Sequence, residues 1–268
     1  MSELRTGGTA VYETLLSDTK DGVRVLTLNR PEVLNALNAR AGDELLDALR
    51  EAERAPEVRC LLLTGSGRAF CAGADLRDHT PGETSLGEIL RTRYNRIIHH
   101  IRTMEKPVVA AVNGVAAGAG CNLALAADLR LASDRASFLQ AFTRVGLIPD
   151  SGGTWLLPRL VGLGRALELM LLAEPIDAPT AERVGLVNRV VPHDDLMARA
   201  MEWAGRLANG PTRAYGLVKR GVAHNLTVGL RDALEYEALL QEVAGRTEDH
   251  REGVAAFLEK RPASYSGR

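Results

Sequence analysis

A single acid, Asp150, lies within an otherwise uncharged stretch of the sequence, GLIPDSGGTWLL at residues 146–157. Burial of an isolated carboxylate is unfavourable, so an acid in such a stretch needs a local reason. A carboxyl group in apolar surroundings can accept a proton and return it, which is general acid–base chemistry. Asp150 could equally be the N-cap of a helix that residues 151–153 open and that includes Trp155. The residues alone leave both roles open.

Two segments rich in glycine and alanine are the other candidates for chemistry: GRAFCAGADLRD at residues 67–78 and NGVAAGAGCNLALAAD at residues 113–128. Each follows an expected strand and precedes an expected helix, where backbone N–H groups lack intrahelical partners and favour negative charge. Two such donors from separate loops can converge on one oxygen as an oxyanion hole. Alternatively, the small residues only allow close packing. Neither segment has a dinucleotide or phosphate-loop pattern, and the chain has no Gly-x-Ser-x-Gly nucleophile motif.

An alternation of strands and helices must position these segments. The apolar and β-branched pattern predicts strands at residues 23–28, 58–63 and 108–112. Apolar spacing and capping residues predict helices from an Asn38 cap to about Arg54, over residues 86–104, and from about Gly118 towards Asp128. This order predicts a layered α/β core over residues 1–191.

The character of the sequence changes after residue 191. Helical patterns follow one another at residues 196–207, 212–223, 228–244 and 253–260. We therefore expect residues 192–268 to form a helical region.

The composition narrows the class of protein. The 268 residues carry a formal net charge of −1, with 46% hydrophobic and 25% charged residues, which is typical of a soluble globular protein. Such a charge gives no general attraction to nucleic acid or to anionic membranes. Cys60, Cys71 and Cys121 form no Cys-x-x-Cys pair, so we expect reduced thiols in a cytoplasm rather than disulfides or a metal site. The first residues lack a secretory pattern, and the uncharged residues 107–127 are too poor in Leu and Ile for a membrane helix.

Four motifs carry a family resemblance: LNRPEVLNAL, GRAFCAGADL, KPVVAAVNGVAAGAGCNLALAADLRLAS and GLIPDSGGTWLLPRL. In this order and spacing, the sequence resembles the crotonase (enoyl-CoA hydratase/isomerase) superfamily over nearly its whole length. The resemblance implies a spiral of ββα turns, with C-terminal helices that mediate homotrimers, which often pair as hexamers. It also implies an acyl-CoA thioester substrate, whose carbonyl oxygen accepts hydrogen bonds from the backbone N–H groups of Ala74 and Ala119. CoA would enter as part of the substrate, and no separate cofactor is expected.

The sequence departs from the hydratases of this family at two positions. Those enzymes add water with two glutamates, where this chain has Asn122 and Phe142. Neither side chain exchanges a proton at neutral pH, and a general acid or base typically contributes about 10²–10⁴ in rate. Efficient hydration is therefore not expected.

Asp150 then becomes the expected catalytic acid–base group. The motif GLIPDSG, with one aspartate and no paired glutamates, resembles the branch of the family that isomerises ring 1,2-epoxyphenylacetyl-CoA. The resemblance implies a one-base isomerase in which Asp150 moves a proton near the thioester, as in a 3,2-enoyl-CoA isomerase. A one-acid hydratase and a non-catalytic acyl-CoA-binding protein remain alternatives. The aryl-CoA dehalogenase branch has a nucleophilic Asp at a similar position but a Trp where this chain has Phe142.

Further binding residues are implied by the resemblance alone. The expected contacts to CoA and the acyl group are Val33, Leu34, Ala36, Ala72, Asp75, Leu76, Arg77, Asn122, Phe142, Phe257 and Lys260. Arg77 could equally be a solvated surface arginine, while Phe257 and Lys260 would reach the CoA of a neighbouring subunit. Phe142 and Leu147 favour an apolar acyl pocket. His99 and His100 are adjacent on a predicted helix and point about 100° apart, so they are expected at the surface rather than on a metal.

Overall fold

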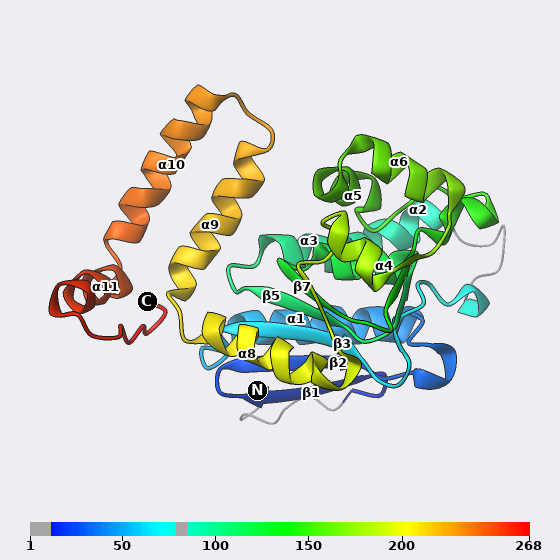
Figure 1. The fold of residues 1–268 in the computed structure, drawn as a ribbon, viewed down its shortest axis with the longest axis horizontal. Helices are drawn as coiled ribbons and strands as arrows, with labels where there is room; N and C mark the ends of the chain where they lie inside the picture. Colours follow the sequence, from blue (N-terminus) through cyan, green and yellow to red (C-terminus); the bar gives the residue numbers. More distant parts are fainter. Residues whose placement is uncertain (1–11, 79–84) are drawn as a thin grey trace, which may run out of the picture.

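The computed structural model describes residues 12–78 and 85–268, which form two β-sheets enclosed by helices (Figure 1). The larger sheet has six strands in the order β1-β2-β3-β5-β7-β10, and all neighbours are parallel except β1 and β2. Its strands are Leu15–Lys20, Val23–Leu28, Cys60–Gly65, Val108–Val112, Leu129–Ser133 and Arg189–Val191. The smaller sheet has the order β4-β6-β8-β9, with strands Ala69–Cys71, Val115–Ala117, Ser137–Leu139 and Ile176–Asp177.

Successive turns of the chain contribute one strand to each sheet and then a helix. β3 and β4 are followed by α2 and α3, β5 and β6 by α4, and β7 and β8 by α5. Within the smaller sheet β4, β6 and β8 pair in parallel, as do β3, β5 and β7 in the larger one. This is the expected ββα spiral, and the prediction of an α/β fold of this class is confirmed.

Helices cover both faces of the larger sheet. The helices of the core are α1 (Ala39–Arg54), α2 (Leu86–Ile89), α3 (Asn95–Thr103), α4 (Ala119–Ala126), α5 (Gly153–Val161), α6 (Leu163–Leu172), α7 (Ala178–Arg183) and α8 (Leu196–Ala208). Asn38 caps α1, because its Oδ1 accepts a hydrogen bond from the Ala41 N–H at 2.9 Å. Leu45 and Leu49 of α1 pack into one core, whereas Ala200 of α8 packs on the opposite face of the sheet.

Three helices stand apart from this core as an arm. They are α9 (Thr212–Asn225), α10 (Leu230–Gly245) and α11 (Glu248–Glu259), and they extend to one side of the molecule (Figure 1). Lys219 anchors α9 to the core through Asp128, with 2.7 Å between Nζ and Oδ2. The helical character predicted for residues 192–268 is thus confirmed, but its first helix, α8, covers the sheet instead of joining the arm. Among the described residues, no helix has the length and apolar character needed to cross a membrane.

Some boundaries differ from the sequence predictions. The strand expected at residues 58–63 is formed two residues later, at Cys60–Gly65, and α11 begins at Glu248 instead of residue 253. The helix expected over residues 86–104 is interrupted by a π turn at Leu90–Tyr94, between α2 and α3. Apolar spacing could not reveal this turn, because residues on either side of it keep helical periodicity.

Candidate active site

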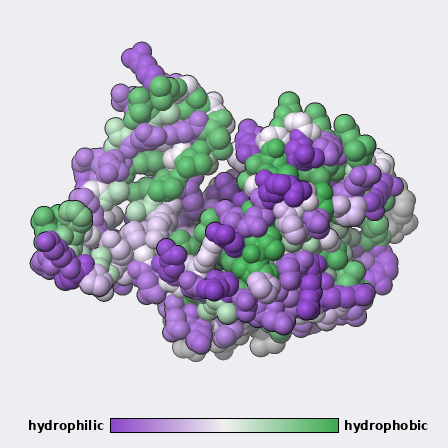
Figure 2. Space-filling model, viewed as in Figure 1, coloured by the Kyte–Doolittle hydropathy of each residue, from purple (hydrophilic) through white to green (hydrophobic). Residues whose placement is uncertain are grey.

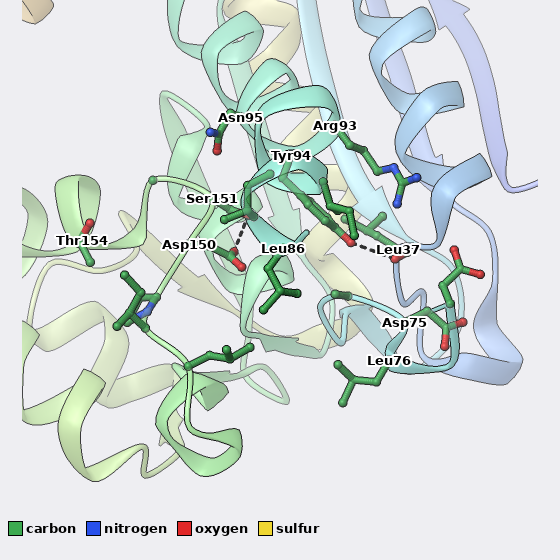
Figure 3. Close-up of a pocket in the computed structure, with 18 residues that line it drawn as sticks. Leu37, Asp75, Leu76, Leu86, Arg93, Tyr94, Asn95, Asp150, Ser151 and Thr154 are labelled. Atoms are coloured by element: carbon green, nitrogen blue, oxygen red, sulfur yellow. Dashed lines mark hydrogen bonds between the residues drawn. The ribbon is translucent and has the colours of Figure 1, made fainter. Parts of the chain in front are cut away.

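A cavity of about 360 Å³ opens between the turn that follows β4, the helix α2 with its π turn, and the loop before α5 (Figure 3). Four of the residues predicted for the site line it, namely Ala74, Asp75, Leu76 and Asp150. Its apolar wall is formed by Leu37, Leu76, Leu86, Ile89, Leu90, Leu147, Ile148 and Pro149. The expectation that Leu147 borders an apolar pocket is thus confirmed.

The carboxyl group of Asp150 faces this cavity (Figure 3). One of its oxygens, Oδ1, accepts a hydrogen bond from the Ser151 hydroxyl at 2.8 Å. Burial raises the pKa of Asp150 above the ordinary value of aspartate, although the Ser151 hydrogen bond acts in the opposite direction. A buried carboxyl with a raised pKa is suited to proton transfer.

Asp150 is not the cap of α5. The helix begins at Gly153 after Gly152, and no side chain caps it. The alternative that the sequence allowed, a side-chain N-cap by Asp150, is therefore wrong. Its backbone carbonyl, by contrast, accepts from the Gly153 N–H at 2.8 Å.

The backbone N–H of Ala74 has no hydrogen-bond partner in the described part of the chain. The β-bridge between Leu37 and Ala74 uses the Gly73 carbonyl and the Asp75 N–H instead. Leu37 donates its N–H to the Gly73 carbonyl at 2.7 Å, and its own carbonyl accepts from the Asp75 N–H at 2.9 Å. This pattern fixes the peptide on each side of Ala74 while its own N–H stays available. Ala74 is exposed on the cavity wall.

The second predicted donor, Ala119, is the first residue of α4, and its N–H likewise donates to no other residue among those described. The two loops lie against each other: a Cβ built on Gly73 would be 2.9 Å from the Ala117 carbonyl oxygen and 3.5 Å from the Ala119 nitrogen. Gly73 has a φ of +102°, which disfavours other residues. Ala119 itself is buried, 4% exposed, and is not part of the cavity wall.

Tyr94 is a cavity residue that the sequence reasoning missed. Its hydroxyl donates to the Leu37 carbonyl at 3.1 Å, so it contacts the residue that forms the β-bridge with Ala74 (Figure 3). Burial raises its pKa to about 12, which keeps the hydroxyl a neutral donor. Its only signal in the sequence was membership of the apolar face of a helix. The π turn brings it, with Leu90 and Arg93, to the cavity wall.

Asn122 and Phe142 are buried and do not line the cavity. Asn122 is fully buried, and its Nδ2 donates to the Asp150 carbonyl oxygen at 2.8 Å. Phe142 is buried, with its ring edge 3.8 Å from the position that a Cβ on Gly118 would occupy. The predicted direct contact of these two side chains with a ligand in this cavity is not supported by their positions.

The predicted CoA contacts at Leu34, Ala36 and Ala72 lie on two segments, one before α1 and one after β4, that hydrogen-bond to other residues of this chain. The Leu34 carbonyl accepts from the Ala72 N–H at 2.9 Å, and the Ala36 carbonyl accepts from Arg30 at 2.6 Å. Val33 ends a short 3-10 turn before them. None of these four predicted residues lines the cavity in the described structure.

Arg77 is exposed but paired. Its Nε lies 3.1 Å from Asp75 Oδ1, and the hydrogen bond from Arg77 lowers the pKa of that carboxyl. Arg30 contacts the other oxygen of Asp75 at 3.1 Å. Asp75 thus brings two cations to the rim of the cavity.

Phe257 and Lys260 lie on the arm, at the end and C-cap of α11, across the molecule from α2 (Figure 1). Phe257 is 83% exposed, and neither residue lines the cavity of its own chain. His99 is exposed, as expected, but His100 is half-buried with Nε2 3.3 Å from Glu53, which corrects the prediction that both lie at the surface. No cluster of possible metal ligands occurs among the described residues.

Comparison with known proteins agrees with this architecture. The family model described as enoyl-CoA hydratase/isomerase matches residues 18–268. A probable enoyl-CoA hydratase of Rhodobacter capsulatus is 48% identical over 96% of this chain and 99% of that protein. The 1,2-epoxyphenylacetyl-CoA isomerase of Escherichia coli is 44% identical over 96% of this chain and all of that protein.

Solved structures give the same result. A putative enoyl-CoA hydratase from Streptomyces coelicolor A3(2) superimposes with a TM-score of 0.91 at 39% identity, covering 98% of each chain. A putative enoyl-CoA hydratase/isomerase from Mycobacterium abscessus has a TM-score of 0.90 at 40% identity, covering 95% of this chain and all of that one. The chain belongs to the enoyl-CoA hydratase/isomerase (crotonase) family.

Proposed function

We propose that this enzyme is an acyl-CoA isomerase in which Asp150 is the acid–base group that transfers the proton. The observation that carries the proposal is a buried carboxyl of raised pKa facing a largely apolar cavity. The two positions that hold glutamates in hydratases of the family are Asn122 and Phe142 here, and neither residue lines the cavity. One carboxyl is sufficient when no water has to be activated.

The proposed reaction is a proton shift along a 3-enoyl thioester. The Asp150 carboxylate takes a proton from the carbon next to the thioester carbonyl, and the electron pair moves onto the carbonyl oxygen as a dienolate. The N–H groups of Ala74 and Ala119 hydrogen-bond this oxygen, and fixed donors of this kind are worth roughly 3–4 kcal/mol each. Asp150 then returns the proton to the far carbon, so the double bond moves next to the carbonyl. The proton transfer requires no cofactor beyond the CoA that the substrate carries.

Two acyl groups are the preferred candidates: a 3-enoyl chain and the ring epoxide of phenylacetyl-CoA. A largely apolar wall in a cavity of about 360 Å³ suits either one. The 44% identity to the Escherichia coli enzyme favours the ring epoxide.

We also propose a homotrimer or a hexamer formed by two trimers. Apolar side chains are exposed along the arm, and Figure 2 shows them as green areas over α9 and α10. They include Val218, Val222, Leu226, Leu230, Leu234 and Leu239. Exposed apolar area of this extent supports burial between subunits. The arm would then bring Phe257 and Lys260 to the CoA of a neighbour.

A substrate panel tests the proposed activity. We expect turnover of a 3-enoyl-CoA ester or of the ring epoxide, and little loss of enoyl absorbance with crotonyl-CoA and water. Hydration without a second acid lacks a contribution of about 10²–10⁴ in rate. Fast hydration of crotonyl-CoA would favour the one-acid hydratase instead. Binding of CoA esters without turnover of any member of the panel would indicate a non-catalytic acyl-CoA-binding protein.

The pH dependence of isomerisation reports on Asp150. Only the ionised carboxyl can accept the proton, so kcat should rise with pH as Asp150 loses its own proton. Because burial raises this pKa, the acid limb of the kcat profile should lie above the value of about 3.9 that is ordinary for aspartate. A pH profile measured with a 3-enoyl-CoA ester checks this. An acid limb at or below the ordinary value would contradict the assignment.

A further inference from the structure

The loop that presents Asp150 has an unfavourable backbone conformation. Ser151 has a φ of +48° although it is not glycine, and Gly152 follows with a φ of +76°. Ser151 is also buried, 2% exposed. A left-handed conformation at such a residue persists only when the surrounding structure holds it.

The side chain of Asn122 hydrogen-bonds the backbone of this loop. Its Nδ2 donates to the Asp150 carbonyl oxygen at 2.8 Å, and the side chain is 0% exposed. The contact is tight, because a Cβ on Gly153 would overlap the Asn122 amide nitrogen. Only glycine therefore fits at the residue where α5 begins.

Gln140 fixes the orientation of the Asn122 amide. Its Nε2 donates to Asn122 Oδ1 at 2.9 Å, which turns the Asn122 nitrogen towards Asp150. The assignment is consistent at both ends, because the Asp150 carbonyl can only accept. Gln140 is 3% exposed, and its Oε1 has no hydrogen-bond partner in the described structure. An unpartnered buried oxygen is unfavourable, so simple packing does not explain an amide here.

We propose that Asn122 is the positioning residue for Asp150 and that Gln140 holds the Asn122 amide in its working orientation. The chain Gln140–Asn122–Asp150 fixes the peptide of the acid, while the Ser151 hydroxyl fixes its carboxyl. This inference rests on the proposed function, in which Asp150 transfers the proton. It also gives position 122 a different role. Hydratases of the family have a catalytic glutamate there, whereas Asn122 in this chain hydrogen-bonds the loop that carries Asp150.

The variant Asn122→Leu tests this role. It replaces the amide by an apolar side chain of similar size and removes the hydrogen bond to Asp150. We expect kcat with a 3-enoyl-CoA ester to fall about 100-fold, the effect of misplacing a reacting group by about 1 Å, with KM unchanged. A released loop would also expose the Asp150 carboxyl to water, so its pKa should fall and the acid limb of kcat should move to lower pH.

A second variant keeps the proposal testable if Asn122→Leu does not fold. Gln140→Leu leaves Asn122 in place but frees its amide to rotate, so it should lower kcat and move the acid limb in the same direction. Either variant, if folded, would overturn the proposal by retaining the kcat and the acid limb of the unmodified enzyme.

Ser133→Ala is the matched control. Ser133 is 0% exposed, and its hydroxyl makes three hydrogen bonds, with the Asp134 carboxyl, the His193 ring and the Arg135 N–H, but it does not line the cavity. It should lower the melting temperature and leave kcat and the acid limb unchanged. If Ser133→Ala lost as much kcat as Asn122→Leu, the effect of Asn122→Leu would be explained by lower stability and the positioning role would be wrong.

The same assay separates failure of the inference from failure of the proposed function. If Asp150→Asn is inactive and Asn122→Leu is fully active, the positioning role is wrong and the role of Asp150 stands. If Asp150→Asn keeps full activity, both are wrong.

Discussion

Replacement of Asp150 by asparagine is expected to lower the isomerase kcat by about 10²–10⁴-fold, the typical contribution of a general acid or base. The amide has nearly the same shape, and it can still accept the hydrogen bond from the Ser151 hydroxyl. It cannot take a proton from the substrate. The fold and the affinity for an acyl-CoA should therefore be retained. Steady-state kinetics, a thermal melt and a titration with an unreactive acyl-CoA measure the three quantities.

Asp177→Asn is the control for this substitution. Asp177 is exposed, caps α7 through the Thr180 N–H at 2.9 Å and does not line the cavity. Asparagine is as good an N-cap as aspartate, so stability and kcat should both be unchanged. Retained turnover in Asp150→Asn would remove this carboxyl from the reaction and, with it, the one-base mechanism.

Gly73→Ala is expected to have the second large effect, about 10²–10³-fold on kcat, which is the loss measured for one oxyanion-hole donor elsewhere. The added Cβ would lie 2.9 Å from the Ala117 carbonyl oxygen, and the φ of +102° disfavours alanine. Relief of this contact requires the loop of Ala74 to move away from the N-terminus of α4. The two proposed N–H donors would then no longer converge on one oxygen. Comparison of kcat with KM for a 3-enoyl-CoA ester measures the effect.

Gly164→Ala provides the matched comparison. Gly164 lies in α6, where an added Cβ meets no atom within 4 Å and the backbone has no positive φ. Alanine in a helix is generally favourable, so stability should be retained and kcat unchanged. If Gly73→Ala were folded and as active as Gly164→Ala, convergence of the two loops would not matter for turnover.

The sequence predicted the fold well where a single segment carried its own signal. Strands Val23–Leu28 and Val108–Val112 have the predicted boundaries, and Asn38 caps α1 as predicted. The three-residue strands β4, β6 and β8 are too short for alternation to be visible. They exist because neighbouring turns of the spiral pair with them, which a local pattern does not contain. Helix α5 was not predicted in full, because Pro158 lies inside it and normally signals a helix end.

The site shows the same division between local and distant information. Asp150 could be found because one acid among uncharged residues is visible in the sequence. The role of Tyr94 depends on Leu37, 57 residues away, and its apolar spacing favoured the core. From the sequence, Asn122 was expected to be unable to replace a catalytic glutamate. Its hydrogen bond to Asp150, 28 residues away, could only be seen in the structure.

The π turn at Leu90–Tyr94 makes the shape of the acyl cavity sensitive to chain length. A π turn closes its hydrogen bonds over five residues instead of four, so it accommodates an extra residue within a helix. Because the extra residue is taken up within the turn, the helical segments on either side keep the relative orientation that a regular helix would give them. Deletion of Thr92, which does not line the cavity, would restore a regular helix and change the cavity wall at the turn itself, where Leu90, Arg93 and Tyr94 line it. The shape of the cavity can therefore change through a single-codon deletion, with every cavity-lining residue type retained.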